Sequence, residues 1–439
     1  ICAGAFEACN NLTTVTLPPS VTHLGAWAFG ACGNLTSVNM GRSGITAVEE
    51  GTFACCEKLN DISLPAGVTR IGEWAFLNCK VFKGIDFNEN ITMIDDNAFY
   101  NCDGITQVHL SDAVDSIGVC AFYNCDSLRD VSIGNGVKRI SQSAFSTCRN
   151  LTNLNLGTSV ESIGGNAFSY CSSLKDLVIP ASVTYIHDGA FCYCSSLATI
   201  QIDEGNPAYD SRDNSNAIIR KSDNTLMQGC ANTLIPNTVA AIGSNAFASM
   251  ANLTVVNIPK SVTSIGYRAF ADCKGLTSVS IPDSVTKISP NTFSGCTGLN
   301  ELTLGKSVNY IDYAAFSGCY NLTSVYCKAI VPPGATTYFN DVFSSNTFNQ
   351  GTLYVPRESV DDYSGAFLWR KFVNIGGKDF VDAGDVDGDG VLGISDVTTL
   401  IDLILQGNAD GISAADVNGD GNVSIADVTD LIDQILLGH

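Results

Sequence analysis

The hydrophobic positions of this chain recur with a period of about twenty-three residues. A Phe marks each unit, and successive Phe positions are twenty-three residues apart, except for one gap of twenty-four and one of fifty-six. A fixed period of this length is typical of a solenoid, in which each turn packs only on its neighbours. The thirteen positions are Phe6, Phe29, Phe53, Phe76, Phe99, Phe122, Phe145, Phe168, Phe191, Phe247, Phe270, Phe293 and Phe316.

Within each unit, two apolar segments precede the Phe. The first, Leu-x-x-Val-x-Ile, alternates apolar and polar residues as in 35–40 and predicts a short strand. The second, Val-x-x-Ile-Gly, leads into Ala-Phe. Stacked turns of this kind predict an α/β repeat, a leucine-rich-repeat solenoid with a parallel β-sheet on one face and irregular or short helical structure on the other.

Twelve of the eighteen Cys residues stand three positions after the repeat Phe, from Cys9 to Cys319. Met250 occupies this place in one unit, and a thioether cannot replace a disulfide partner. Free Cys behaves as a small, often buried hydrophobe. We therefore predict a column of reduced thiols in the core.

Breaks in the period predict the domain boundaries. The solenoid is expected over 1–327, with a loop and hairpin inserted at about 203–234, where the Phe spacing is longest. Residues 328–376, with a strand near 352–356 and a short helix near 360–372, are expected to cap its end. A linker over 377–384 then leads to a separate module over 385–439.

Charge excludes some partners. The net charge is −21, which argues against nucleic acid and anionic membranes as ligands. No run of eighteen apolar residues occurs, so we expect no membrane insertion. The segment 379–439 holds thirteen Asp and no Lys, Arg or Glu, which leaves about −8 for the rest of the chain.

The acidic segment contains two calcium-loop patterns, at 385–396 and 416–427. Each has oxygen-bearing side chains at positions 1, 3, 5 and 12 and a Gly at position 6. A curled loop turns every second residue toward one hard cation, which prefers six to eight oxygen ligands. We predict that these loops bind two Ca²⁺ ions. Val391 would contribute its backbone carbonyl, and the complete set of predicted ligand residues is Asp385, Asp387, Asp389, Val391, Asp396, Asp416, Asn418, Asp420, Asn422 and Asp427.

The repeat sequence resembles that of a known family. Residues 262–273, Val-Thr-Ser-Ile-Gly-Tyr-Arg-Ala-Phe-Ala-Asp-Cys, are similar to the BspA-like leucine-rich repeats of secreted and surface bacterial proteins, and the resemblance covers about 1–327. It implies adhesion to host or microbial surface proteins or glycans. The chain begins within a repeat at Ile1, so we expect its natural N-terminus, with any signal peptide, to precede it.

The acidic module resembles a type I dockerin over about 384–437, because each calcium loop leads into an amphipathic helix. This resemblance implies docking to a cohesin on a scaffold protein, often beside polysaccharide-degrading enzymes. By position, the family's cohesin contacts correspond to Ile394, Ser395, Ile425 and Ala426. Well-known members carry small hydroxyl residues here, so the alternative is that both Ile side chains pack internally.

The sequence predicts no catalytic constellation. Its four His residues, His23, His109, His187 and His439, are each isolated. We therefore expect a secreted or cell-surface binding protein that is not an enzyme. Its solenoid is either an adhesion surface or a structural spacer for which the dockerin contact is the only specific interaction. An accessory to a carbohydrate-active enzyme is the more distant alternative.

Overall fold

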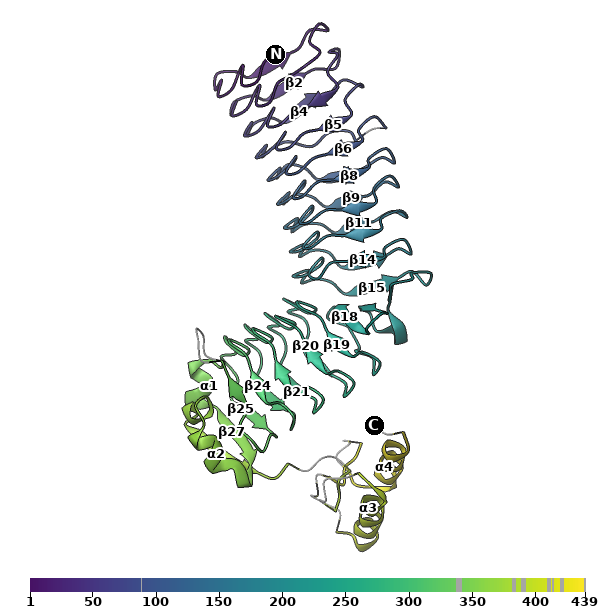
Figure 1. The fold of residues 1–439 in the computed structure, drawn as a ribbon, viewed down its shortest axis with the longest axis vertical. Helices are drawn as coiled ribbons and strands as arrows, with labels where there is room; N and C mark the ends of the chain where they lie inside the picture. The colour runs from purple at the N-terminus through teal and green to yellow at the C-terminus, as the bar shows by residue number, and fades with distance from the viewer. Residues whose placement is uncertain are drawn as a thin grey trace.

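The chain forms an elongated solenoid followed by a small two-helix module at its C-terminal end (Figure 1). The computed structural model describes residues 1–87, 89–336, 342–380, 384–387, 392–408, 412, 414–418 and 422–437. Each repeat makes one turn, and the apolar positions of successive repeats form columns along the interior. The Leu, Val, Ile, Phe and Cys of the pattern are the residues of that core.

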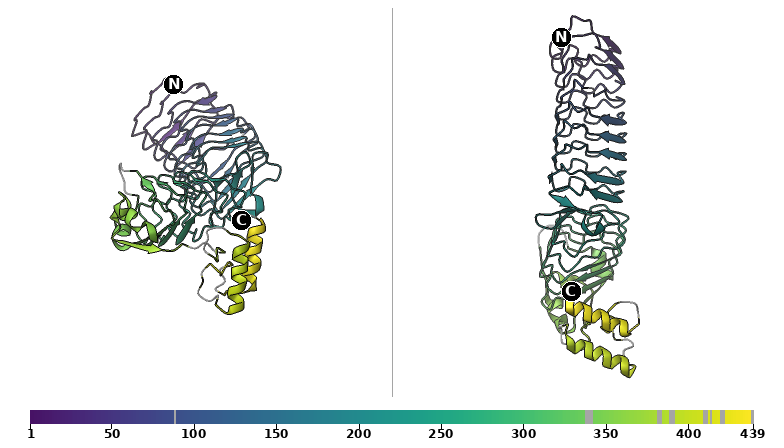
Figure 2. Two further views of the ribbon diagram at one scale, coloured as in Figure 1. Left: turned by 60° about the horizontal axis from the view of Figure 1, so that its bottom comes forward. Right: turned by 90° about the vertical axis from the view of Figure 1, so that its right-hand side faces the viewer.

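The Leu-x-x-Val-x-Ile segments form a ladder of short parallel strands, as predicted. Their register is fixed, so that Val15 lies beside Val38 and Val38 beside Ile62. Figure 2 shows the strand edges stacked along one side of the molecule. The strands are β1 (Thr14–Thr16), β2 (Ser37–Asn39), β4 (Asp61–Ser63), β7 (Gln107–His109), β9 (Asp130–Ser132), β11 (Asn153–Asn155), β13 (Asp176–Ile179), β15 (Thr199–Ile202), β21 (Ser278–Ile281), β23 (Glu301–Leu304), β25 (Ser324–Cys327), β27 (Thr352–Pro356) and β28 (Asn374–Lys378).

The Val-x-x-Ile segments form a second parallel ladder, which the sequence analysis did not predict. Its strands are β3 (Ala47–Val48), β5 (Arg70–Ile71), β6 (Met93–Ile94), β8 (Ser116–Ile117), β10 (Arg139–Ile140), β12 (Ser162–Ile163), β14 (Tyr185–Ile186), β19 (Ala241–Ile242), β20 (Ser264–Ile265), β22 (Lys287–Ile288), β24 (Tyr310–Ile311) and β26 (Gly334–Ala335). Of the irregular or short helical structure expected on this side, short α-helices are not found, since the described part of 1–336 contains no α-helix.

Left-handed backbone explains why the turn beside each Phe is not helical. Residues two positions before and two after the Phe have positive φ, for example 58° at Trp27 and 56° at Ala31. Such angles interrupt a right-handed helix. The backbone N–H groups instead bond to the next turn, as Phe29 N does to Thr52 O at 3.0 Å.

The Phe side chains stack in two continuous columns. Ring centroids of successive turns lie 4.9–5.8 Å apart, from Phe6 to Phe191 and from Phe247 through Phe316 to Phe343. This spacing follows from the separation of hydrogen-bonded strands. All eighteen Cys are free, as predicted, and eleven of the twelve repeat Cys are buried, with Cys9 exposed at the first turn.

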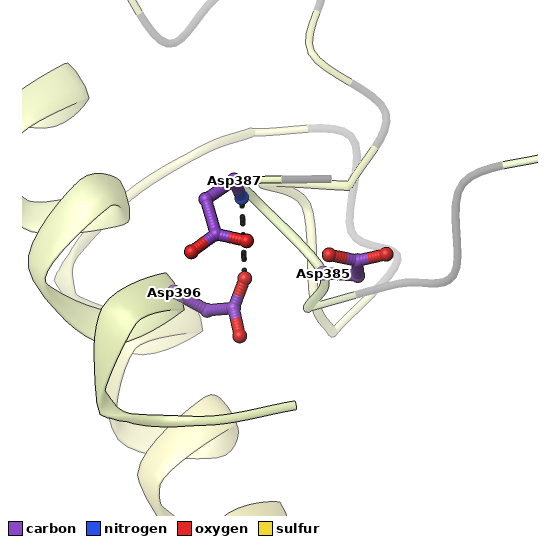
Figure 3. A group of neighbouring side chains, drawn as sticks. All are labelled: Asp385, Asp387 and Asp396. Atoms are coloured by element: carbon purple, nitrogen blue, oxygen red, sulfur yellow. Dashed lines mark hydrogen bonds between the residues drawn. The ribbon is translucent and has the colours of Figure 1, made fainter. Parts of the chain in front are cut away.

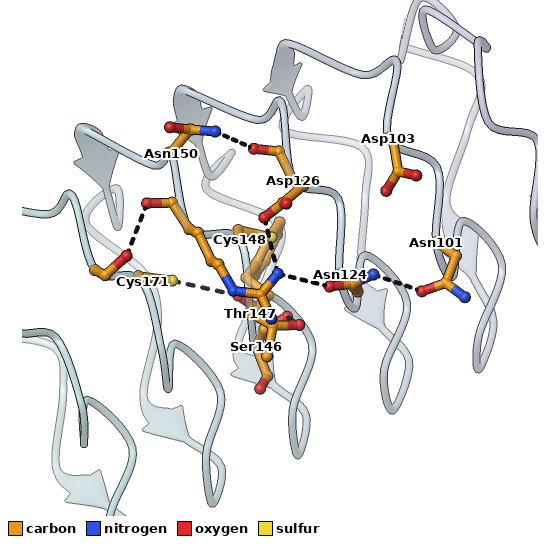
Figure 4. Close-up of polar contacts among 12 residues, drawn as sticks. Asn101, Asp103, Asn124, Asp126, Ser146, Thr147, Cys148, Asn150 and Cys171 are labelled. Atoms are coloured by element: carbon orange, nitrogen blue, oxygen red, sulfur yellow. Dashed lines mark hydrogen bonds and ion pairs between the residues drawn. The ribbon is translucent and has the colours of Figure 1, made fainter.

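A polar column runs beside the thiols on the loop edge (Figure 4). Asn101 donates its side-chain N–H to the amide oxygen of Asn78, and Asn124 donates to that of Asn101, each at 2.9 Å. Thr147 occupies the same place in the next turn, where Arg149 reaches back to the Asn124 oxygen at 3.3 Å. These contacts link consecutive turns through side chains.

The insertion at 203–234 separates two stacks of turns, which meet at an angle in Figure 1. It contains β16 (Tyr209–Asp210), the 3₁₀ turn η1 (Arg212–Asn214), β17 (Ile218–Arg220) and β18 (Thr225–Gln228). β17 pairs antiparallel with β16 and with β18, and β18 then pairs parallel with β19. The hairpin thus supplies the first strand of the second stack.

Residues after Cys327 cover the far end of the core. The segment contains α1 (Ser345–Gln350), η2 (Arg357–Ser359), α2 (Val360–Gly365) and η3 (Trp369–Lys371), in addition to β27 and β28. Trp369 is buried and donates its indole N–H to Pro333 O at 2.9 Å. The single helix expected near 360–372 is therefore interrupted, because Ala366 adopts extended backbone.

The predicted start of the linker at 377 lies within a strand. β28 runs to Lys378 and pairs with β27 along its whole length, so the sheet extends beyond that boundary. The Lys378 ammonium lies 4.4 Å from the ring centroid of Tyr326, and Arg357 forms a salt bridge with Asp379 at 2.8 Å. The chain is thus attached to the solenoid as far as Asp379.

Candidate calcium centre and docking surface

The C-terminal module is built from two equivalent halves. Helices α3 (Ile394–Gln406) and α4 (Ile425–Leu437) pack through a small apolar core of Val397, Leu400, Ala415, Val417, Val428 and Leu431. Val397 and Val428, and Leu400 and Leu431, occupy corresponding places thirty-one residues apart. The repeated sequence therefore folds into a pseudo-twofold pair of loop and helix.

Asp396 occupies the last position of the first loop and the first turn of α3, and backbone donors hold its carboxylate. One oxygen accepts from Val386 N at 2.7 Å and Asp387 N at 3.1 Å, and the other from Gly393 N at 2.8 Å. Asp396 is fully buried. The start of the loop is thereby tied to the helix that follows it.

Three carboxylates converge on this point (Figure 3). Each of Asp385, Asp387 and Asp396 offers an oxygen, and these oxygens lie within 4.8 Å of one another. Asp385 is 7% exposed and Asp387 is exposed. Grouped anionic oxygens are the ligand set that Ca²⁺ prefers, and the segment 379–439 contains no Lys or Arg to neutralise them. The residues therefore fit a calcium ion.

The second loop repeats the same hydrogen bonds. One Asp427 oxygen accepts from Val417 N at 2.9 Å and Asn418 N at 3.2 Å, and the other accepts from Ser424 N at 2.8 Å. Burial of this carboxylate would raise its pKa, but the backbone donors outweigh burial and lower the pKa. Asp427 is thus kept in the ionised form that binds a cation.

The structure describes most of the predicted ligands. Asp416 is partly buried at the start of the second loop, and Asn418 and Asn422 are exposed. The predicted ligands Asp389, Val391 and Asp420 lie outside the described residues. Sequence spacing identified the carboxylates, but the backbone donors that hold Asp396 and Asp427 follow only from the folded loops.

The residues predicted to contact a partner lie on the surface. Ile394 is 77% exposed and Ile425 is 74% exposed, and Ser395 and Ala426 beside them are exposed. The alternative that both Ile side chains pack internally is therefore wrong. The same degree of exposure in both halves gives the module two equivalent apolar surfaces at the starts of its helices.

The outward positions of the strand ladder carry small polar side chains. Around β9 and β11 they line a shallow hollow of about 640 Å³, in which Asp130 accepts from Asn153 at 3.1 Å and contacts His109 at 3.0 Å. This surface offers hydrogen bonds together with the exposed apolar side chain of Val178. No helix in the described part of the chain is long and apolar enough to cross a membrane.

Solved structures from bacteria have the same architecture. A leucine-rich repeat protein from Bacteroides ovatus is 27% identical with a TM-score of 0.55, and the match covers 74% of this chain and 82% of that one. A leucine rich cell surface protein from Faecalibacterium prausnitzii is 25% identical with a TM-score of 0.57, over 84% and 88% of the two chains. No curated protein sequence gives a significant match.

Family comparison assigns both parts of the chain. The model of the BspA type leucine rich repeat region matches residues 1–106, 92–212 and 226–349, and the model of the dockerin type I domain matches 383–436. The first match covers well over half of the sequence. The chain therefore belongs to the BspA-type leucine-rich-repeat family, and it ends in a type I dockerin domain.

Proposed function

We propose that this protein is a non-catalytic, extracellular or cell-surface binding protein that docks to a cohesin through its calcium-loaded dockerin. In this proposal the solenoid extends an interaction surface away from the docking point. Both domains belong to non-catalytic classes. The observation that carries the proposal is a duplicated arrangement. In each half of the module, a buried Asp and an exposed Ile lie together in the first turn of the helix.

The duplicated loops support binding of two calcium ions. The carboxylates of Asp385, Asp387 and Asp396 face one another in the first loop, and Asp427 accepts the corresponding backbone bonds in the second. A bound cation would offset repulsion among these oxygens and so hold the first turn of each helix. The helix starts, which carry the exposed Ile side chains, would thus take their docking positions only when calcium is bound.

A binding experiment with the full-length chain tests the docking proposal. Purified type I cohesin modules would be titrated with the chain in calcium and then in chelator, with the Asp385→Ala/Asp416→Ala variant as the control for the loops. Saturable binding that is lost in chelator and in the variant supports docking. Failure of every cohesin to bind, or binding indifferent to calcium, contradicts it.

The pseudo-twofold module should dock in either of two orientations. Ile394→Asp and Ile425→Asp each destroy one apolar surface and leave the other intact. We expect each single variant to bind cohesin within about threefold of the parent, and the double variant to weaken binding more than about thirtyfold, since anchor residues dominate interfaces. Calorimetric titration measures this difference, and a large loss in one single variant alone would show that only one orientation is used.

The solenoid is proposed as an adhesion surface for a protein or glycan. The polar hollow at β9 and β11 supports this role, because His109, Asp130 and Asn153 offer hydrogen bonds on one face. The alternative is a spacer that binds nothing, which the small outward side chains equally allow. A glycan and host-protein array probed with the chain, after its dockerin is saturated with cohesin, separates the two roles.

A further inference from the structure

Two of the three Trp residues lie together on the loop edge of the N-terminal stack. The rings of Trp27 and Trp74 are 6.4 Å apart, although the two residues are two turns apart. Gly51 stands between them, and a Cβ there would lie 2.4 Å from the Trp27 indole. Both indoles are partly exposed, whereas the third Trp, Trp369, is fully buried.

This pair departs from the repeat. Trp27, Gly51 and Trp74 occupy the left-handed position two residues before the Phe, where the next three turns carry Asn97, Cys120 and Ser143. A bulky residue gains nothing from positive φ, because its Cβ crowds the backbone there. The fold accepts small side chains at this position, so it does not itself require two indoles.

A column of three carboxylates runs beside the indoles. Glu50, Glu73 and Asp96 each precede the left-handed residue of consecutive turns. The Trp27 indole N–H donates to Glu50 at 3.2 Å, and Val119 N donates to Asp96 at 2.6 Å. None of the three carboxylates forms a salt bridge within the described residues.

The positive charge of the neighbouring Arg70 is already paired with carboxylates outside this column. Arg70 forms salt bridges with Glu49 and Asp95, the residues that precede Glu50 and Asp96 in the chain. Desolvation, together with the negative charges of Asp96 and Glu50, raises the pKa of Glu73. Like charges at this spacing repel one another, so the column has an excess of negative potential that a bound cation would relieve.

We propose that Trp27 and Trp74, with Glu50, Glu73 and Asp96, bind a cationic Arg or Lys side chain presented by a protein partner. The face of an indole attracts a guanidinium or ammonium group, and adjacent carboxylates complement its charge. Trp residues at protein interfaces are frequent anchors. A neutral sugar would use the indole faces alone and leave the repulsion among the carboxylates in place, so charge complementarity favours the cation.

The test uses the full-length, calcium-loaded chain and an acetylated, amidated tetra-arginine peptide, followed by NMR of the three indole N–H signals. We expect saturable shifts for Trp27 and Trp74 and none for Trp369. Replacement of arginine by neutral citrulline should abolish the shifts. Affinity should fall with ionic strength, as it does for exposed charges.

Variants separate this site from general attraction to an acidic protein. Glu50→Gln/Glu73→Gln/Asp96→Asn should weaken peptide binding at least tenfold, and Trp74→Leu by about fivefold, the range for an exposed cation–π contact. Glu204→Gln/Glu301→Gln/Glu358→Gln removes three exposed charges elsewhere and should change affinity less than twofold. Equal losses in the two triple variants would overturn the proposal.

Two further results would also overturn it. One is a shift of the Trp27 and Trp74 signals by the neutral oligosaccharide cellohexaose and not by tetra-arginine. The other is the absence of any indole shift at millimolar peptide. The site lies in the solenoid and does not involve the dockerin, so either result would leave the docking proposal unchanged.

Discussion

A buried thiol closes each turn of the solenoid. The Cys after each Phe donates its S–H to the carbonyl of the Phe one turn earlier, at 3.0–3.4 Å from Cys32 to Cys319. In most turns this is the second hydrogen bond of that carbonyl, which also accepts from a backbone N–H of its own turn, as Phe53 O does from Cys56 N at 3.2 Å. Cys combines a small apolar volume with a weak donor, which explains why it recurs here rather than Ala or Ser.

Alkaline pH should therefore weaken the solenoid. Burial raises the pKa of Cys148 to about 12 from its ordinary value of 9.0, and the pKa of Cys56 to about 12. The folded state favours the protonated thiol, so this contribution to stability is complete below pH 9 and decreases as the pH rises toward 12.

Two measurements check this expectation. At pH 8 a thiol reagent should label the exposed Cys2 and Cys9 quickly and the buried repeat Cys only on unfolding. The midpoint of urea unfolding should then fall steadily above pH 9. Rapid labelling of the buried thiols at pH 8, or a midpoint unchanged up to pH 11, would contradict the thiol column as described.

The Asn column beside the thiols can be extended by one substitution. Thr147 has φ 61°, an angle that a β-branched residue adopts poorly and Asn adopts readily. In Thr147→Asn, the new amide is placed to donate to Asn124, as Asn124 does to Asn101. The new amide bond replaces the bond that the Thr147 hydroxyl makes to Ser146 O, so the gain comes from relief of the strained left-handed backbone. We expect the free energy of unfolding to rise by about 1 kcal/mol.

Thr147→Val is the matched control for the Asn column. It keeps the branched shape but removes the hydroxyl, which donates to Ser146 O at 2.7 Å, and offers no amide. This variant should be less stable than the parent in the same thermal unfolding experiment. A Thr147→Asn variant no more stable than Thr147→Val would rule out a stabilising role for the column.

At the scale of elements, the insertion depends on one glycine. Phe247 begins the second Phe column, and a Cβ on Gly229 would lie 2.1 Å from its ring. Gly229 N also donates to Ala246 O at 2.8 Å, which joins the hairpin to the second stack. Gly229→Ala should destabilise the second stack by about 1–3 kcal/mol through overpacking.

The matched control for the insertion is Gly365→Ala, since a Cβ at Gly365 meets nothing within 4 Å. Hydrogen exchange resolved along the chain is the measurement, because a solenoid can open one stack at a time. Faster exchange over β19 and β20 in Gly229→Ala, and not in Gly365→Ala, is the expected result. Exchange rates over β19 and β20 that are the same in the two variants would show that Phe247 can move aside freely.

The two ladders show how far the repeat pattern could be interpreted from sequence. The first ladder was predictable because Leu-x-x-Val-x-Ile shows the alternation of a half-buried strand. The second was missed because strands such as Arg70–Ile71 have two residues, too few for any alternation. The indole pair could not be predicted from the sequence either. Trp27 and Trp74 lie two turns apart, and their rings come close only because Gly51 has no side chain between them.

The calcium loops were more predictable than their surroundings. Spacing alone placed Asp385, Asp387 and Asp396 near one ion, because ligands from a single loop depend on local geometry. Exposure of Ile394 and Ile425 was left open, since an apolar side chain at a helix start suits either a core or an interface. Only the packing of α3 on α4, which uses Val397 and Val428 instead, decides between them.

At the scale of the whole molecule, the chain divides into parts with different sources of stability. The solenoid has a continuous core of stacked Phe, Leu, Val, Ile and Cys columns. Among the residues that the structure describes, the dockerin core is a cluster of six buried apolar residues, and the segment from 379 onward carries thirteen Asp. A core of that size cannot offset the repulsion among so many carboxylates. Calcium should therefore stabilise the dockerin and leave the solenoid unaffected.

Removal of calcium tests this division in the intact chain. All three Trp residues lie in the solenoid and its cap, so Trp fluorescence reports on that part alone. In chelator we expect unchanged Trp emission and an unchanged midpoint of fluorescence-detected thermal unfolding, with rapid proteolysis confined to residues after Asp379. Readdition of calcium should restore protection, because the bound ion stabilises only the folded loops.

The Asp385→Ala/Asp416→Ala variant is the control and should be cleaved in the same region even in calcium. The position of the first cut is informative, since the sheet and the Arg357–Asp379 salt bridge hold the chain to the solenoid up to that point. Cleavage within β28, or a calcium-dependent change in Trp emission, would show that the two parts are energetically coupled. Protection of the dockerin in chelator would instead mean that its small core suffices without metal.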